Sequence, residues 1–141
     1  MANADFDSTT PLDEVRQSIK LVLASYPSLN PNGNCVYDSA SLADPEFDFQ
    51  KYRNELLTDD ACRQFNLAVA WLKQCPRTKT INRRKSSYGL KEEVEDWAHG
   101  YVGNGAFIAA ALHLGYKTIL TDGYPNAYLN ISKKERPAPR P

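Results

Sequence analysis

The sequence has no long apolar run and no leader-like beginning. No stretch of its 141 residues approaches the roughly 18 apolar residues that a membrane-spanning helix requires. Its first ten residues, MANADFDSTT, lack both the basic start and the apolar middle of a secretory signal. Hydrophobic residues make up 42% and charged residues 24%, as in ordinary globular domains. We therefore expect a cytoplasmic globular protein without membrane contact.

Cysteine and histidine are scarce, which argues against disulfides and metal sites. The three cysteines are an odd number and form no CxxC pair. Cys62 and Cys75 fall on one predicted helix, where a rise of 1.5 Å per residue places them about 20 Å apart, too far for a disulfide. His99 and His113 are the only histidines, and no cysteine lies at zinc-ligand spacing from them. The prediction is reduced thiols and no metal.

Signatures of cofactor binding and catalysis are also missing. The glycine-rich turn GYVGNG is not the GxGxxG fingerprint of a dinucleotide site, and no strand is evident before it. No spacing favours one Cys–His pairing over another. The carboxylates of 92–96 fall on the polar face of a helix, where such residues are ordinary solubility groups. We predict a non-enzymatic protein with no catalytic residue and no cofactor.

The formal net charge is zero, but the charges are divided between the two halves of the chain. Residues 1–60 carry eleven acids and four bases, whereas residues 61–141 carry thirteen bases and six acids. Such a division indicates a surface for polyanions in the second half. The alternative is that the acidic half packs against the basic half and neutralises it.

Periodicity and turn residues predict the order of the elements. Apolar residues at three- and four-residue spacing predict helices over 10–25, 58–74 and 88–97, and alternation predicts short strands over 79–82, 116–120 and 127–132. The segment 27–48 has no period. We expect a flexible N-terminus (1–9), one domain (10–132) and a basic proline-rich tail (133–141). The fold class predicted is mostly α with a small C-terminal β-hairpin, a winged helix-turn-helix-like α+β unit spanning 58–132.

The helix predicted over 106–114, AFIAAALHL, fits poorly as the DNA-reading helix of such a unit. A reading helix presents polar side chains to base edges, and this one has hardly any polar face. A helix that is apolar all round belongs in the interior. We therefore favour a core helix, with Asn104 as its N-cap and His113 as an interior or boundary residue.

The most basic window runs from Arg77 to Lys91 and contains no acid. Three consecutive cations precede two serines at a predicted helix start, where hydroxyls and free N–H groups suit a phosphate. Alternatively, a serine caps the helix and the arginines pair with the glutamates of the same helix. We predict DNA or other nucleic acid as partner, through phosphate contacts from Arg77, Lys79, Arg83, Arg84, Lys85, Ser86, Ser87, Lys91, Asn104 and Lys117.

An acidic and aromatic segment in the first half supports a different hypothesis. Its carboxylates mimic phosphate charge, and its phenylalanines suit a protein partner, although packing against the body is the commoner fate of aromatics. A protein-binding surface here would consist of Asp44, Glu46, Phe47, Asp48 and Phe49.

The stretch SSYGLKEEVEDWAHGYVGNGAFIAAALHLGY resembles a segment of small uncharacterised proteins carried by bacterial plasmids, phages and integrative elements. The resemblance implies a small DNA-binding regulator of a mobile genetic element. Alternatively, it implies an inhibitor of a host defence protein, of the anti-restriction or anti-CRISPR type, acting through the acidic half. A third hypothesis is a homodimer that uses the apolar helix as its interface.

Overall fold

The computed structural model describes residues 10–34 and 43–139. The predicted flexible N-terminus, 1–9, lies outside the described residues, as does Cys35. The elements follow in the order α1 (Leu12–Ser25), β1 (Leu29–Asn30), β2 (Gly33–Asn34), α3 (Phe49–Arg53), the 3-10 helix η2 (Asn54–Leu57), α4 (Asp59–Leu72), β3 (Arg77–Asn82), α5 (Ser87–Ala98), α6 (Asn104–His113), β4 (Thr118–Leu120) and β5 (Ala127–Ile131).

The N-terminal helices form for the local reasons that the sequence indicates. α1 ends at Ser25 as predicted and buries Val15, Ile19, Val22 and Leu23 along one face. The predicted range begins with Thr10 as N-cap and Pro11 as first helical residue, whereas in the structure Pro11 is the N-cap and Leu12 the first residue. α4 begins after Thr58, whose hydroxyl accepts a hydrogen bond from the Ala61 N–H at 3.2 Å.

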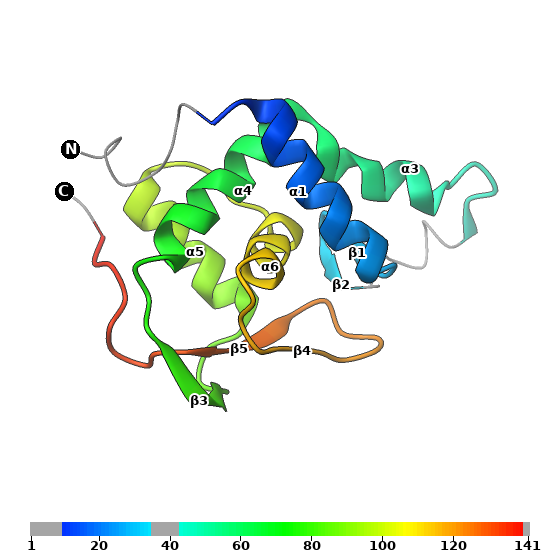
Figure 1. Cartoon of the computed structure of the whole chain (residues 1–141). Coiled ribbons are helices and arrows are strands. Elements are labelled where there is room, and N and C mark those ends of the chain that lie inside the picture. The colour runs from blue at the N-terminus through cyan, green and yellow to red at the C-terminus, as the bar shows by residue number, and fades with distance from the viewer. Residues whose placement is uncertain (1–9, 35–42, 140–141) are drawn as a thin grey trace.

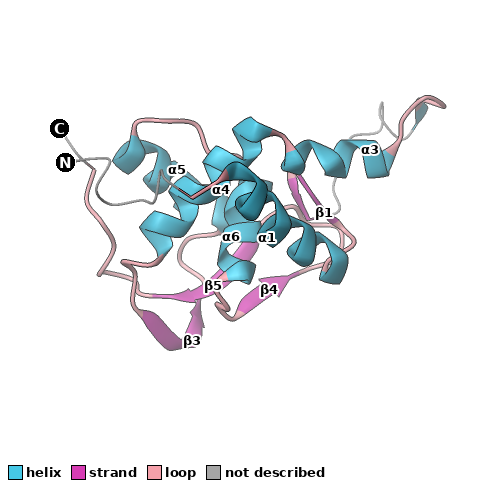
Figure 2. Cartoon of the chain, turned by 45° about the horizontal axis from the view of Figure 1, so that its top comes forward, coloured by secondary structure: helices cyan, strands magenta, loops and turns pink. Residues whose placement is uncertain are grey.

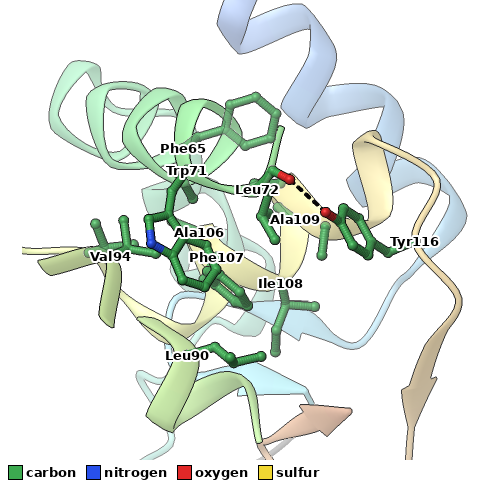
Figure 3. Packing of buried hydrophobic residues seen from close by; sticks show 14 of the residues in the cluster. Phe65, Trp71, Leu72, Leu90, Val94, Ala106, Phe107, Ile108, Ala109 and Tyr116 are labelled. Carbon is green, nitrogen blue, oxygen red and sulfur yellow. Dashed lines mark hydrogen bonds between the residues drawn. The ribbon is translucent and has the colours of Figure 1, made fainter. Parts of the chain in front are cut away.

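The apolar helix α6 lies at the centre of the molecule, so the prediction of a core helix is confirmed. Every residue from Asn104 to Ala111 is buried. The small alanines let α4 approach closely, and Trp71 of α4 meets the ring of Phe107 edge-on at 6.2 Å (Figure 3). Gly103, not Asn104, is the N-cap, and His113 is exposed rather than interior, with its ring 5.4 Å from that of Phe65.

Three strands form an antiparallel sheet in the order β3-β5-β4. The central strand β5 turns Ala127, Leu129 and Ile131 into the core, all of them fully buried. The helices lie on that side of the sheet, and the opposite face is covered by no described helix (Figures 1 and 2). This uncovered side is called the outer face below.

A buried arginine, Arg53, binds the C-terminal end of α1 and the short hairpin β1–β2. The Arg53 side chain, 7% exposed, donates to the carbonyls of Leu23 and Tyr26 at 2.8 Å each, beside the end of α1. A third bond goes to the Leu29 carbonyl of β1 at 2.8 Å. These acceptors compensate the buried charge because the last carbonyls of a helix carry partial negative charge. Burial lowers the pKa of Arg53.

The predicted winged helix-turn-helix fold is wrong. In the described part of the chain, the strands form one sheet of two strands and one of three, and they are not confined to a single C-terminal hairpin. β3 precedes α5 and α6 in sequence yet pairs with β5, and the helix in the position of the reading helix is buried. Strands of two residues, such as β1 and β2, are too short to show an alternating pattern. The pairing of β3 was missed because its partner strand, β5, lies about fifty residues later in the sequence.

Candidate nucleic-acid interface

The edge strand β3 carries a bulge that pushes basic residues outward. From Arg77 to Asn82 the strand advances five residues while its partner β5 advances two, from Ile131 to Leu129. The extra residues leave the ladder, and Arg77 through Thr80 are exposed. Bulges at sheet edges redirect side chains in this way. Lys79 therefore stands clear of the sheet.

Three further exposed cations, Arg83, Arg84 and Lys117, lie directly after β3 or directly before β4 of the same sheet. The Lys117 ammonium lies 3.5 Å from the Lys79 carbonyl oxygen. The Arg83 guanidinium lies 5.8 Å from the centre of the Tyr128 ring, and Arg84 is the next residue and exposed. Within residues 10–34 and 43–139, none of these four cations forms an ion pair with a carboxylate. We name Lys79, Arg83, Arg84 and Lys117 with Tyr128 the basic sheet face.

Arg77 borders the basic sheet face but has a structural task. Its guanidinium donates to the carbonyls of Leu114 and Gly115, the latter at 3.3 Å, just past the end of α6. The same group lies 4.5 Å from the centre of the Tyr116 ring. Arg77 thus holds the C-terminal end of the core helix, as cations near helix ends do.

Two of the predicted phosphate ligands are instead neutralised by glutamates of α5. The Lys85 ammonium lies 2.7 Å from the Glu93 carboxylate, which Arg136 also contacts at 2.7 Å. Lys91 is 7% exposed and lies 3.3 Å from the Glu95 carboxylate, with the rings of Tyr88 and Tyr101 at 4.7 and 5.1 Å. Both lysines therefore already have a carboxylate partner.

Ser87 and Asn104 are buried, and their hydrogen bonds connect the starts of α5, α6 and β5 to the β1–β2 turn. The Ser87 hydroxyl donates to the Asn104 side-chain oxygen at 2.7 Å and accepts the Ala127 N–H at 2.9 Å. The Asn104 amide donates to the Asn32 and Pro125 carbonyls and to the Asn126 side chain. Neither side chain faces solvent. Ser86 is the half-buried N-cap of α5, and its hydroxyl makes no capping bond.

In the part of the chain that the structure describes, no carboxylate of the first half forms an ion pair with a base of the second half. Among the described residues, every ion pair of a base in 61–141 is made with Glu93 or Glu95 of the same half. The remaining pairs join Arg16 to Asp13 and Asp59 within the first half. The two halves do pack together, since α1 contacts α4 and α6, but no described acid of the first half pairs with a cation of the basic sheet face.

The predicted protein-binding segment is built mainly from local contacts. Asp44 accepts the Glu46 N–H at 2.9 Å, and Asp48 caps α3 by accepting the Lys51 N–H at 3.1 Å. Phe47 and Phe49 are half-buried, and the ring of Phe47 is 6.1 Å from that of Tyr52. Binding of a host defence protein to this segment stays a prediction.

Sequence reasoning missed Tyr128 as a member of the site. A usable signal existed, because Tyr128 stands between residues whose alternation predicts a buried face, so its own side chain must point to the other face. The cross-link from Arg136 to Glu93 had no such signal, since forty-three residues separate the two.

Comparisons with protein-family models, with curated proteins and with solved structures each find no match to this chain. None of the helices in the described part of the chain combines the length and apolarity needed to cross a bilayer. The same residues hold no group of three or more His, Cys, Asp or Glu side chains arranged to bind a metal ion.

Proposed function

We propose that this protein binds nucleic acid through phosphate contacts made by the basic sheet face. The observation that carries the proposal is a set of four exposed cations on or next to strands of one sheet, none of which pairs with a carboxylate of the described residues. A phosphate backbone is the complementary partner, because Lys and Arg that neutralise phosphates release condensed counterions. Lys79 and Lys117 supply compact charges, whereas Arg83 and Arg84 offer planar forks that suit phosphate oxygens.

Contacts from the basic sheet face to phosphates would account for affinity for nucleic acid but not for recognition of a particular base sequence. Phosphate contacts fix position and carry no base information directly. The proposed activity is therefore independent of sequence at this face. A role as regulator of a mobile genetic element is the biological setting that we propose for it, on the resemblance given above.

The test is the dependence of binding on salt. If the four cations each contact a phosphate, the logarithm of the binding constant falls with the logarithm of salt concentration at a slope of about −3 to −4. Lys79→Ala combined with Arg84→Ala is expected to flatten the slope by about 2 and to weaken binding at every salt concentration. Fluorescence anisotropy with a labelled oligonucleotide measures both quantities.

The matched control removes the same two residue types elsewhere. Lys20 of α1 and Arg63 of α4 are exposed, so Lys20→Ala with Arg63→Ala gives the same net charge without touching the sheet. This control is expected to keep the wild-type slope. Absence of binding even at low salt would overturn the proposal, and equal slopes for both double variants would show that the basic sheet face is not the interface.

A further inference from the structure

Tyr128 occupies the centre of the outer face. It lies on β5, the middle strand, between the inward-facing residues Ala127 and Leu129. Its partner across the β4–β5 ladder is Ile119, so the two side chains share the outer face. Both are half-buried. The centre of this face is therefore an aromatic and aliphatic patch, and cations surround it.

The cations are placed at the border of this patch. Lys79 lies on the bulge of β3 and Lys117 directly before β4, on opposite sides of the central strand, yet they touch at 3.5 Å through the Lys79 carbonyl. Arg83 leaves the end of β3 and reaches over the Tyr128 ring at 5.8 Å. The described helices lie on the other side of the sheet (Figure 1). A partly exposed aromatic ring with an arginine beside it thus lies on the outer face.

We propose that the nucleic acid bound here carries unpaired bases, one of which stacks on Tyr128 while its flanking phosphates contact the surrounding cations. This inference rests on the proposed function and adds the class of nucleic acid. In a duplex, each base is covered above and below by the neighbouring base pairs. A duplex therefore offers the outer face of the sheet its phosphates but no free base to stack on Tyr128. An unpaired base offers its π-face, and stacking on aromatic side chains tolerates any base. The Arg83 guanidinium then lies beside the stacked base, where a cation–π contact favours it.

The experiment compares single and double strands that carry equal numbers of phosphates. At the same salt concentration, a short oligothymidylate is expected to bind the wild-type protein about tenfold more tightly than the duplex. Tyr128→Leu keeps an apolar cover on the sheet but removes the ring, and should weaken single-strand binding about tenfold while leaving duplex binding unchanged. Tyr128→Phe keeps the ring and should bind as wild type. Oligouridylate in place of oligothymidylate shows whether RNA or DNA is the better source of unpaired bases.

A control variant and an NMR measurement on the wild-type protein complete the experiment. Tyr26→Leu, just after the end of α1, removes an exposed tyrosine ring far from β5 in sequence and is expected to leave binding unchanged. Ring proton resonances of Tyr128 in the wild-type protein should shift upfield when oligothymidylate is added, a reading that does not depend on any variant folding. An absent shift would overturn the inference.

The failures of the two proposals are distinguishable. Equal affinity for single strand and duplex, with Tyr128→Leu silent and salt dependence intact, would overturn the stacking inference and leave phosphate binding standing. Loss of all binding would overturn both.

Discussion

Basic residues in this chain perform three different tasks, and their surroundings decide which. Arg53 and Arg77 stabilise the ends of α1 and α6 through carbonyl oxygens. Arg136 and Lys85 share the carboxylate of Glu93, and Lys79 stands in solvent. A guanidinium or ammonium is costly to bury without acceptors, so each inward-facing cation is matched to oxygens. The exposed cations without a carboxylate partner are the ones available to another molecule.

Glu93 gives the first prediction at this scale. Burial alone would raise its pKa, but hydrogen bonds from Arg136 and Lys85 outweigh burial and lower it. A carboxyl whose folded pKa is depressed contributes stability above its unfolded pKa of about 4.3, and loses it as pH falls through the folded value. We expect Glu93→Gln to lower the free energy of unfolding at pH 7 by about 1–3 kcal/mol and to lose less stability on acidification than wild type. Urea unfolding at neutral and acidic pH measures this.

Glu92, the neighbouring residue, provides the control for that experiment. It is exposed on α5, so Glu92→Gln should leave both the stability and its acid dependence close to wild type. If Glu93→Gln and Glu92→Gln behave alike, the shared contact with Arg136 and Lys85 contributes nothing measurable.

At the scale of elements, α6 is the helix on which α1, α4, α5 and the β1–β2 hairpin pack. Its first turn lies against the β1–β2 turn, where the Gly105 N–H donates to the Pro31 carbonyl at 3.1 Å. Its centre packs on α1, α4 and α5, and its end is held by Arg77. An apolar helix with four alanines can lie so close to its neighbours because little side-chain bulk separates the backbones.

Gly105 supplies the prediction at the scale of elements. A Cβ there would overlap the Asn30 backbone carbonyl, so Gly105→Ala must push the β1–β2 turn away from α6. We expect destabilisation by about 1–3 kcal/mol, although alanine favours helix over glycine by about 1 kcal/mol. Gly100→Ala is the matched control, because its Cβ would meet only Leu67 at 3.7 Å, an ordinary contact. Thermal unfolding compares the two, and equal midpoints would contradict the close approach.

Considered whole, the molecule has a closed core on one side of the sheet and an open charged face on the other. The core is continuous through all the larger helices and reaches β5. Cys62 and Cys75 lie within it. Burial raises the pKa of both thiols, that of Cys75 to about 12, so neither carries appreciable thiolate at neutral pH.

Thiol labelling tests the closure of that core. In a native Cys35→Ser variant, the rate at which Cys62 and Cys75 react with a thiol reagent should be limited by the rate at which the protein unfolds around them. Once the variant is unfolded in urea, both thiols should react at the rate of a free, exposed cysteine. The dependence of the rate on urea, followed by absorbance, should match the unfolding curve. Stoichiometric labelling within seconds in native buffer would show that the core is open near these residues.

Local pattern in the sequence was sufficient for some features. The buried stripe of α1, the Thr58 cap of α4 and the interior place of α6 each depend on residues a few positions apart, so the sequence alone determined them. The zero net charge and its division between halves were equally visible.

The tertiary structure decided the remaining features, because they join distant residues. Pairing of β3 with β5 brings together residues about fifty apart, and it replaced a terminal hairpin with a three-stranded sheet. The same folding placed Glu93 between Lys85 and Arg136, and it brought the Lys117 ammonium to the carbonyl of Lys79, thirty-eight residues away in the sequence. A cation's availability depends on which carboxylates the chain brings within reach, and no local pattern encodes that distance.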